Sequence, residues 1–414
     1  MTDITANQMT HDIKTISLVS TAHGMSHFYQ LVLPPLLPLL KIAFGVSYTD
    51  LGLLISAFYV ASGLAQTPAG FLVDRLGART VLVGGLGLYG VAIGLLGLMP
   101  QFWMLIPCAA LAGVGNSVFH PADYSVLSAN VSPHRMARAY SAHALSGNLG
   151  WVLAPMTILG LASLVGWHHA LLIVGAFGVG LAIVLGLFGS LLDENTGRAR
   201  HKSGGTTPAR ALLAPAIIMC LLYFVVVSIA GTSIQAFLPS ALHTMHGISL
   251  AAAATALTFY VIGTAGGVIT GGIIADRKIR PDYIIAISLF AAAALILLVG
   301  ALGPTDTGLM ALLAGVGFCA GVSGPSRDML VRGASPPGST GKVFGFVYSG
   351  FDIGSAITPF ILGFFLDRQQ PGMLFVLAAI GYVLGIFTAV TLRRQSDGSR
   401  ARASHPDPAG EPAE

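Results

Sequence analysis

The chain reads GFLVDRLGAR from residue 70 to residue 79 and GIIADR from residue 272 to residue 277. The two stretches share the pattern Gly-x-x-x-Asp-Arg. Further pairs recur in the same order at nearly the same offset: Leu-Ala-Gly-Val-Gly at 111–115 and 313–317, Gln30-x-x-x-Pro34 and Gln235-x-x-x-Pro239, and Gly150-x4-Pro155 and Gly354-x4-Pro359. Such internal self-similarity predicts two halves that arose by duplication.

Long apolar blocks surround these repeats. The chain is 54% hydrophobic and only 9% charged, whereas soluble proteins carry about 25% charged residues. Blocks of about 20 residues match the bilayer's hydrocarbon thickness of about 30 Å. They predict an all-α integral membrane protein, with twelve transmembrane helices in two pseudo-symmetric six-helix bundles. The expected spans are residues 16–41, 49–71, 78–99, 102–127, 138–161, 167–192, 212–240, 250–274, 281–302, 307–331, 343–366 and 372–392.

Polar segments flank and separate the two predicted bundles. Because each half has six spans, the halves share one orientation and are related by an axis along the membrane normal. The connection between them is basic and rich in Gly and Ser, as flexible linkers are. No basic segment precedes the first apolar block, so we expect no cleaved signal peptide. The predicted organisation is an N-terminal tail at 1–14, bundles at 15–192 and 212–394, a linker at 193–211 and a disordered tail at 395–414.

Lysine and arginine positions predict the orientation in the membrane. With the N-terminus in the cytoplasm, Lys41 and Arg368 fall outside, Arg327 falls within a helix, and every other lysine and arginine falls inside. We therefore expect a multi-pass protein of the cell inner (plasma) membrane, surrounded by lipid bilayer, with both termini cytoplasmic. The pI near 9.0 reflects this orientation and not nucleic-acid binding, since no stretch interleaves aromatic and basic residues.

The stretch from Gly70 to Arg79 resembles the loop motif between helices 2 and 3 of the major facilitator superfamily. Its weaker copy falls between predicted helices 8 and 9. The resemblance implies that fold and a cytoplasmic gate, in which Gly70 lets two helices approach and Asp74 faces the positive end of a helix from the other half. The alternative is positive-inside anchoring only. The implied gate residues are Gly70, Asp74, Arg75, Gly77, Arg79, Gly272, Asp276 and Arg277.

A narrower resemblance is to fosmidomycin-resistance-type exporters within that superfamily. It rests on Ser20-x-x-His23, Gln30, Gln66-x-Pro68 and Val118-Phe119-His120-Pro121. The chain departs from the group at His27 and Ala122, where the group usually has acidic residues, and again in the segment 325–328. If those carboxylates carry protons in the group, that role has moved or been lost here. The resemblance therefore implies efflux without identifying a substrate.

Polar residues follow one face of the first predicted helix, because Ser20, His23, His27, Gln30 and Pro34 are spaced by 3, 4, 3 and 4 residues. The seventh helix carries Ser228, Thr232, Gln235 and Pro239 in the same register. Two matched stripes predict a central substrate cavity. For small side chains such as Asn148, Thr232 and Ser355 the alternative is a hydrogen bond that holds helices together. The predicted cavity residues are His23, His27, Gln30, Asn116, His120, Asn148, Gln235, Arg327 and Asp352.

Formal charges within the predicted spans are few: Asp123, Arg327, Asp328 and Asp352. Each is informative, because a charge at the bilayer centre costs at least about 2.5–3.5 kcal/mol. Asp123 and Arg327 occupy equivalent positions in the two repeats, so we expect them to form an ion pair, either in a structural gate or at the substrate. Arg327 could instead bind the carboxylate or phosphonate of an anion in bidentate fashion.

Proton coupling requires a group that gains and loses a proton as access alternates. An unperturbed histidine has a pKa of about 6.5 and suits this task, and a desolvated carboxylate can also serve. For any one of the histidines the alternative is a hydrogen-bonded core residue. The candidates for proton coupling are His23, His27, His120, Asp123 and Asp352.

The favoured function is secondary active transport of a small organic molecule by alternating access, as proton-coupled efflux (drug/proton antiport). The alternative is proton-coupled uptake (symport) of a small organic anion, with Arg327 as the anion site. A membrane sensor or an intramembrane enzyme is disfavoured, because no output domain or catalytic cluster is present.

Gly85-x-Gly87-x-x-Gly90 lies in an apolar helix without a preceding strand, so no nucleotide site is predicted. The three cysteines lack metal-ligand spacing; we expect no cofactor, no metal and a monomer.

Overall fold

The computed structural model describes residues 2–132, 135–192, 212–275, 279–302, 306–335 and 340–404. Within these ranges the chain forms helices joined by short turns, and it contains no strand. The predicted linker at 193–211 lies outside the described residues, and so does the end of the predicted C-terminal tail, residues 405–414.

The first half of the chain begins with a helix that two prolines interrupt and ends with one very long helix. Its elements are α1 (Thr2–Gln30), the 3-10 turn η1 (Pro34–Leu36), α2 (Leu37–Phe44), α3 (Tyr48–Leu76), α4 (Ala78–Leu96), α5 (Phe102–Asn116), α6 (Phe119–Asn130), α7 (Met136–Phe188) and η3 (Ser190–Leu192). The second half consists of α9 (Pro215–His246), α10 (Leu250–Ala275), α11 (Pro281–Leu302), α12 (Asp306–Ala334), α13 (Thr340–Asp367) and α14 (Met373–Ser404).

The number of membrane passes follows from helix length and composition. Among the described residues, 11 helical segments are long and apolar enough to cross a membrane. One of them, Arg138–Phe188, has 51 residues, more than twice the roughly 20 that span a bilayer. Gly166 divides it with a φ of +78°, which a residue without a Cβ adopts at little cost. The long segment therefore supplies two spans, and the predicted all-α fold with twelve transmembrane helices is confirmed.

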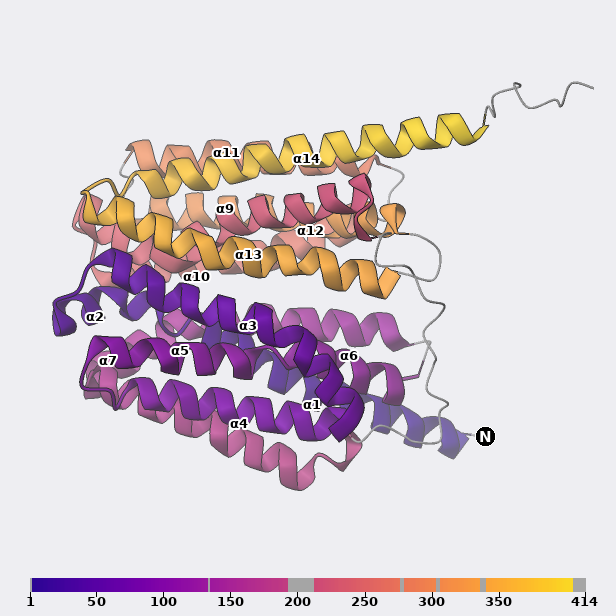
Figure 1. Cartoon of the computed structure of the whole chain (residues 1–414), viewed down its shortest axis with the longest axis horizontal. Helices are drawn as coiled ribbons and strands as arrows, with labels where there is room; N and C mark the ends of the chain where they lie inside the picture. The colour runs from indigo at the N-terminus through magenta and orange to yellow at the C-terminus, as the bar shows by residue number, and fades with distance from the viewer. Residues whose placement is uncertain are drawn as a thin grey trace, which may run out of the picture.

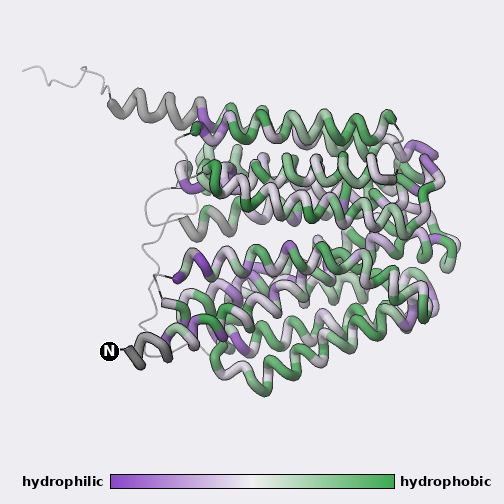
Figure 2. Tube along the Cα trace, turned by 180° about the vertical axis from the view of Figure 1, so that it is seen from behind, coloured by the Kyte–Doolittle hydropathy of each residue, from purple (hydrophilic) through white to green (hydrophobic). Residues whose placement is uncertain are grey.

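The helices lie roughly parallel in two layers (Figure 1), with α9 to α14 above and α1 to α7 below. The start of α1 and the end of α14 lie at one end of the bundle, which we call the terminus end. The connection from α1 through α2 to α3 lies at the opposite end. Figure 2 shows hydrophobic residues along most of each helix and hydrophilic residues gathered toward both ends, as expected for a protein that crosses a bilayer.

The residues predicted as a polar N-terminal tail continue α1 as helix from Thr2. Asp12 within this segment is fully buried. Its carboxylate accepts a hydrogen bond from the backbone N–H of Ser132 at 3.4 Å and lies 3.3 Å from Nη1 of Arg135. The segment is therefore held against the connection between α6 and α7, which a hydropathy pattern alone does not indicate.

The predicted span at 102–127 is two helices, α5 and α6, interrupted at Ser117 and Val118. Pro121 explains the interruption. It has no N–H to donate to the carbonyl of Ser117 four residues earlier, and its ring crowds that carbonyl. The break starts a new helix just before His120, so α6 can present its side chains at a different angle from α5.

The two halves contact each other most tightly along α3 and α13, near the opposite end. A Cβ on Gly52 of α3 would overlap the backbone of α13, and a Cβ on Gly363 of α13 would overlap the carbonyl oxygen of Tyr48. Asp367, the last residue of α13, accepts hydrogen bonds from the backbone N–H groups of Tyr48 (2.6 Å) and Thr49 (2.8 Å) and from the Thr49 hydroxyl (2.6 Å). A carboxylate of one half thus caps the first turn of a helix in the other.

Candidate functional site

Glycines allow α1 and α7 to pack backbone against backbone. A Cβ on Gly150 of α7 would overlap the carbonyl oxygen of Gly24 on α1, and a Cβ on Gly24 would lie 3.0 Å from the carbonyl oxygen of Ser146. Nearly one turn earlier, a Cβ on Gly147 would lie 2.7 Å from Nδ1 of His27. This close approach brings the histidines of α1 within reach of side chains on α7.

A cluster of His23, Asp123 and His143 joins α1, α6 and α7. Nδ1 of His23 and Nε2 of His143 each lie 3.0 Å from Oδ2 of Asp123. All three side chains are buried, and the two imidazole rings stack with their centroids 3.5 Å apart. The second carboxylate oxygen, Oδ1, is buried without a hydrogen-bond partner among the described residues. A carboxylate and two imidazoles are thus confined together inside the first half.

The charge of this cluster depends on how many protons it holds. When Asp123 is ionised, its oxygen can only accept, so both ring nitrogens donate to it. With both imidazoles neutral the cluster carries one negative charge, and one added proton makes it neutral. The two nitrogens and the carboxylate oxygen lie within 4.8 Å of one another, a spacing that a metal centre could also have. Here the nitrogens contact the carboxylate directly, as in a proton-holding cluster.

Two further histidines border the cluster. The ring of His27 lies 4.4 Å from that of His23 and 4.4 Å from that of Trp151, measured between centroids. The ring of His120 lies 5.6 Å from that of His23 and stacks on Tyr124 at 6.1 Å. His120 is exposed and His23 is buried. Imidazoles therefore lead from an accessible position to the buried carboxylate.

A chain of hydrogen bonds continues from Trp151 across the first half. The indole N–H of Trp151 on α7 donates to Oε1 of Gln30 on α1 at 3.0 Å. Nε2 of Gln30 donates to Oδ1 of Asn116 on α5 at 3.1 Å, and Nδ2 of Asn116 donates to the hydroxyl of Ser62 on α3 at 2.9 Å. Each amide accepts from one neighbour and donates to the next, so the chain has one direction.

Asp352 of α13 lies where the other half meets this chain. A Cβ on Gly63 of α3 would lie 3.1 Å from the Cβ of Asp352, and Tyr59, one turn earlier, interacts electrostatically with the Asp352 carboxylate. Because Gly63 follows Ser62, the hydrogen-bonded chain ends next to a carboxylate of the second half. The hydrogen-bonded chain from Trp151 to Ser62 lies between Asp352 and Asp123, and the two carboxylates do not contact each other.

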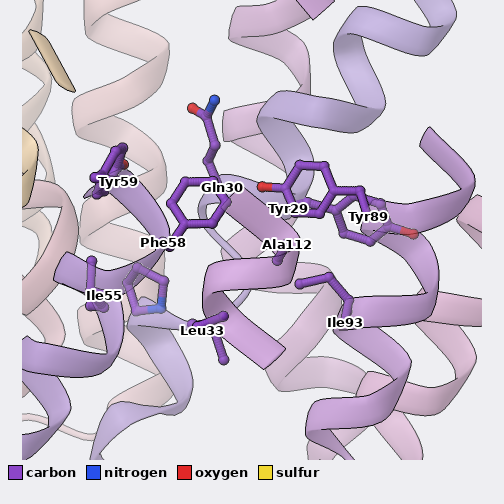
Figure 3. A pocket seen from close by; sticks show the side chains of 11 residues that line it. Tyr29, Gln30, Leu33, Ile55, Phe58, Tyr59, Tyr89, Ile93 and Ala112 are labelled. Atoms are coloured by element: carbon purple, nitrogen blue, oxygen red, sulfur yellow. The ribbon is translucent and has the colours of Figure 1, made fainter. Parts of the chain in front are cut away.

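A small cavity lies inside the first half, between α1, α3, α4 and α5. Figure 3 shows the rings of Tyr29, Phe58 and Tyr89 and the amide of Gln30 among the side chains that line it. Its volume of about 20 Å³ is enough for a single water molecule. It is too small for an organic molecule.

Arg327 and Asp328 of α12 form an ion pair in the second half, with Nε of Arg327 3.0 Å from Oδ1 of Asp328. The hydroxyl of Tyr348 donates to the same oxygen at 3.2 Å. The guanidinium lies 4.6 Å from the ring centroid of Phe224 and 5.3 Å from that of Phe351. Aromatic rings of α9 and α13 therefore hold one side of the guanidinium.

The ion pair expected between Asp123 and Arg327 is not formed. Asp123 contacts His23 and His143, and Arg327 contacts Asp328. Equivalence in the repeat places the two residues at matching positions of the two halves, but it does not bring their side chains together. Each charge is compensated within its own half, as a buried or partly buried charge requires.

Within the described part of the chain, the remaining predicted cavity residues form no hydrogen bond with these groups. Asn148 donates to the carbonyl oxygen of Ala144 in its own helix at 2.9 Å, and Gln235 is half-buried on α9. The hydroxyl of Thr232 lies 2.8 Å from that of Ser355 and links α9 to α13. The contact between Thr232 and Ser355 corresponds to the helix-joining alternative.

The predicted gate motif lies at the terminus end, where α3 turns into α4. Gly77 makes the turn with a φ of +84°, and Nη2 of Arg79 donates to the carbonyl oxygen of Gly186 in the same half at 2.6 Å. A Cβ on Gly70 or on Gly272 would meet no atom of the described residues within 4 Å. The close helix approach expected at Gly70 is therefore absent from this structure, because the halves meet at the opposite end.

Other members of the motif give no contact to interpret. Arg75 is exposed. The side chain of Asp74 and residues Asp276 and Arg277 lie outside what the structure describes. The gate therefore remains a prediction from the resemblance.

No repeat or spacing rule pointed to His143 or Trp151, although both belong to the site. They are eight residues apart with Gly147 midway, so all three share one face of α7. That face packs on α1 through Gly147. The spacing of a histidine and a tryptophan four residues to either side of a helix-packing glycine could have predicted that they face another helix.

Two six-helix halves with polar clusters inside them are the architecture that many secondary transporters use. The family model of the Major Facilitator Superfamily matches residues 19–277 and 221–412. The chain belongs to this superfamily, and it is a transporter and not an enzyme.

Individual relatives agree with this assignment. The chain is 25% identical over 393 residues to the fosmidomycin resistance protein of Escherichia coli (strain K12), covering 90% of this chain and 91% of the relative. It is 24% identical over 350 residues to a probable L-galactonate transporter of the same organism, covering 79% and 77%. A solved bacterial homologue of the human lysosomal transporter Spinster, inward-facing and unoccupied, has a TM-score of 0.72 at 17% identity and covers 96% of this chain and 99% of that chain.

Proposed function

We propose that the protein is a proton-coupled exporter of a small organic molecule that works by alternating access. The observation that carries this proposal is the buried cluster of His23, Asp123 and His143, whose net charge changes by one with a single proton. Histidine is the side chain that titrates near neutral pH when unperturbed. Exposed His120 beside the cluster offers a route for the proton.

Coupling requires that the charge of the cluster influence how the halves meet. The hydrogen-bonded chain from Trp151 through Gln30 and Asn116 to Ser62 provides a physical connection, since it ends where Asp352 of the second half packs on α3. In this proposal a proton on the cluster alters the position of α1 relative to α7, and the chain transmits that change to the contact between α3 and α13.

The closed end is the outward-facing end in this proposal. The excess of lysine and arginine supports cytoplasmic chain termini, and with that orientation the tight contact of Asp367 with α3 faces outward. The state described here is then closed outside and loosely packed inside. Export must break the Asp367 cap once per cycle, driven by a gradient that supplies about 2.3 kcal/mol per charge and 100 mV. The name of the fosmidomycin resistance protein favours export over uptake.

Proton-coupled uptake of a small organic anion is the second candidate. The favouring observation is Arg327 on α12, whose side chain is partly exposed. The probable L-galactonate transporter among the relatives is named for an organic anion. Uptake and export use the same fold and differ in the relative direction of proton and substrate.

The two candidates give opposite signals in proteoliposomes. Vesicles with an internal pH dye, equal pH on both sides and the voltage clamped by potassium and valinomycin receive L-galactonate, fosmidomycin or a hydrophobic drug outside. Antiport expels protons as substrate enters, so the lumen becomes alkaline. Symport carries protons inward, so the lumen becomes acidic. Acidification would overturn export, and absence of any proton signal during measured substrate entry would overturn proton coupling.

A matched pair of variants tests the cluster itself. His143→Gln should abolish the proton signal. His169→Gln should leave it intact, because His169 is exposed and its hydrogen bond among the described residues is to the carbonyl oxygen of Val165 in its own helix. A chelator should leave the wild-type signal unchanged if the cluster holds a proton and not a metal ion. An intact signal in His143→Gln would show that the cluster does not couple.

A further inference from the structure

The ion pair of Arg327 and Asp328 presents two opposite charges side by side at an accessible position. The side chain of Arg327 is 17% exposed and that of Asp328 is 37% exposed. Tyr124 on α6, in the other half, is 45% exposed and interacts electrostatically with Asp328. The pair therefore faces the first half of the molecule and is open to a ligand.

The guanidinium of Arg327 retains hydrogen-bonding capacity. A guanidinium has five N–H donors, and within the described part of the chain only Nε has an acceptor, Oδ1 of Asp328. The rings of Phe224, Phe351 and Tyr348 lie 4.6, 5.3 and 5.8 Å from the guanidinium carbon. These rings pack against the guanidinium without accepting hydrogen bonds from it. Its Nη groups can therefore bind a carboxylate through two parallel hydrogen bonds.

Asp328 retains capacity of the opposite kind. Its Oδ1 already accepts from Nε of Arg327 and from the hydroxyl of Tyr348, whereas Oδ2 accepts from no described residue. A carboxylate can accept about four hydrogen bonds. An ammonium group placed at Oδ2 would therefore find a charged acceptor next to the guanidinium that binds the carboxylate.

Charge balance selects between ligand classes. A simple anion bound to Arg327 would lie beside the negative Asp328, and a simple cation bound to Asp328 would lie beside the positive Arg327. A molecule with adjacent carboxylate and ammonium groups presents the complementary order of charges. The nearby aromatic rings add contact area for an apolar body and can also attract an ammonium group.

We propose that Arg327 and Asp328 together recognise a zwitterionic, amino-acid-like substrate with an apolar body. The carboxylate of the substrate binds the Nη groups of Arg327, and its ammonium group binds Oδ2 of Asp328. The proposal rests on the proposed transport function and names its substrate class.

Binding to the purified full-length protein in nanodiscs tests this class with matched probes. Phenylalanine is compared with 3-phenylpropionate, which lacks the amine, and with 2-phenylethylamine, which lacks the carboxylate. Leucine, 4-methylpentanoate and isoamylamine form a parallel aliphatic set. Since a hydrogen bond to a charged group contributes a factor of about 10–100, the amino acid of at least one set should bind about tenfold or more tightly than both analogues.

Two variants each remove one of the two proposed recognition groups, and they should change the order of affinities in different ways. Asp328→Asn should remove the advantage of phenylalanine over 3-phenylpropionate. Arg327→Gln should weaken both acids but not 2-phenylethylamine, because it removes the positive charge beside the proposed ammonium site. Arg332→Gln, which removes an exposed charge from the same helix, should change none of these affinities. Variants are compared only after they elute as the wild-type protein does.

Each contrary result is decisive. If 3-phenylpropionate binds the wild-type protein as tightly as phenylalanine, or if neither amino acid binds at millimolar concentration, the zwitterion proposal is overturned. The test is independent of coupling: amino acids that bind without evoking proton movement would contradict the transport proposal alone. Proton movement evoked by 3-phenylpropionate but not by phenylalanine would contradict the zwitterion proposal alone.

Discussion

The two halves of the molecule share a scaffold but differ in the chemistry that they hold. At equivalent positions of the repeat, the first half has Asp123 bonded to histidines, and the second has Arg327 bonded to Asp328. His23 and His27 of α1 correspond to Ser228 and Thr232 of α9, whose hydroxyls contact that of Ser355. The two halves therefore share the packing of their helices, but the histidine cluster lies in the first half and the ion pair of Arg327 and Asp328 lies in the second.

This difference supports a division of roles. A cluster whose charge changes with one proton suits coupling, and a neutral pair with unused donors and acceptors suits recognition. Placing the two in separate halves means that relative movement of the halves changes the environment of both. Each prediction below tests one side of this comparison.

Asp123→Asn should produce the largest effect. The amide keeps the size of the side chain but removes the charge, so proton-driven accumulation should fall by a factor of about 100, the low end of what a positioned proton-transfer group contributes. Substrate exchange at equal pH should persist, because the second half is untouched. Both are measured as substrate uptake into proteoliposomes, with and without a pH gradient. Loss of exchange together with accumulation would contradict the division of roles.

The shared scaffold predicts equal damage in the two halves. A Cβ on Gly150 would overlap the backbone of α1, and a Cβ on the equivalent Gly354 would lie 2.6 Å from the carbonyl oxygen of Val225 on α9. Gly150→Ala and Gly354→Ala should each destabilise the protein by about 1–3 kcal/mol, seen as a lower thermal unfolding midpoint. Gly160→Ala is the control, since a Cβ there meets nothing within 4 Å. Tolerance of either substitution would contradict the close packing.

Asp367→Ala should weaken the contact between the halves. Loss of a helix cap costs about 0.5–2 kcal/mol, which should raise the population open at the opposite end by a factor of about 2–30. Spin labels at Ile42→Cys and Gln370→Cys, exposed positions of the two halves, report the distance across that end. An unchanged distance distribution would mean that the cap does not hold this end closed.

Trp151→Phe should have the smallest effect. The ring beside His27 remains, but Gln30 loses the indole donor at 3.0 Å, a loss of about 1 kcal/mol. We expect a few-fold slower proton-coupled transport and unchanged substrate affinity. A change in affinity with normal coupling would place Trp151 in recognition instead.

The fold could be predicted from the sequence because hydropathy and helix length are local properties. The polar face of α1 could be predicted for the same reason, since one helix determines its own periodicity. The partners of that face could not, because His143 and Trp151 reach α1 only through the glycine contacts of α7. The prediction of an ion pair between Asp123 and Arg327 was wrong, because equivalent positions in the two repeats need not be close in space.

The central claim is that a proton on the cluster of His23, Asp123 and His143 changes how the two halves meet. Its most direct test is the Ile42–Gln370 spin-label distance, measured without substrate from about pH 5 to about pH 9, the range around the ordinary histidine pKa. In the wild-type protein the populations should shift across this range, and in Asp123→Asn combined with His143→Gln they should not respond. An identical pH response in that double variant, where His27 and His120 remain, would contradict the account.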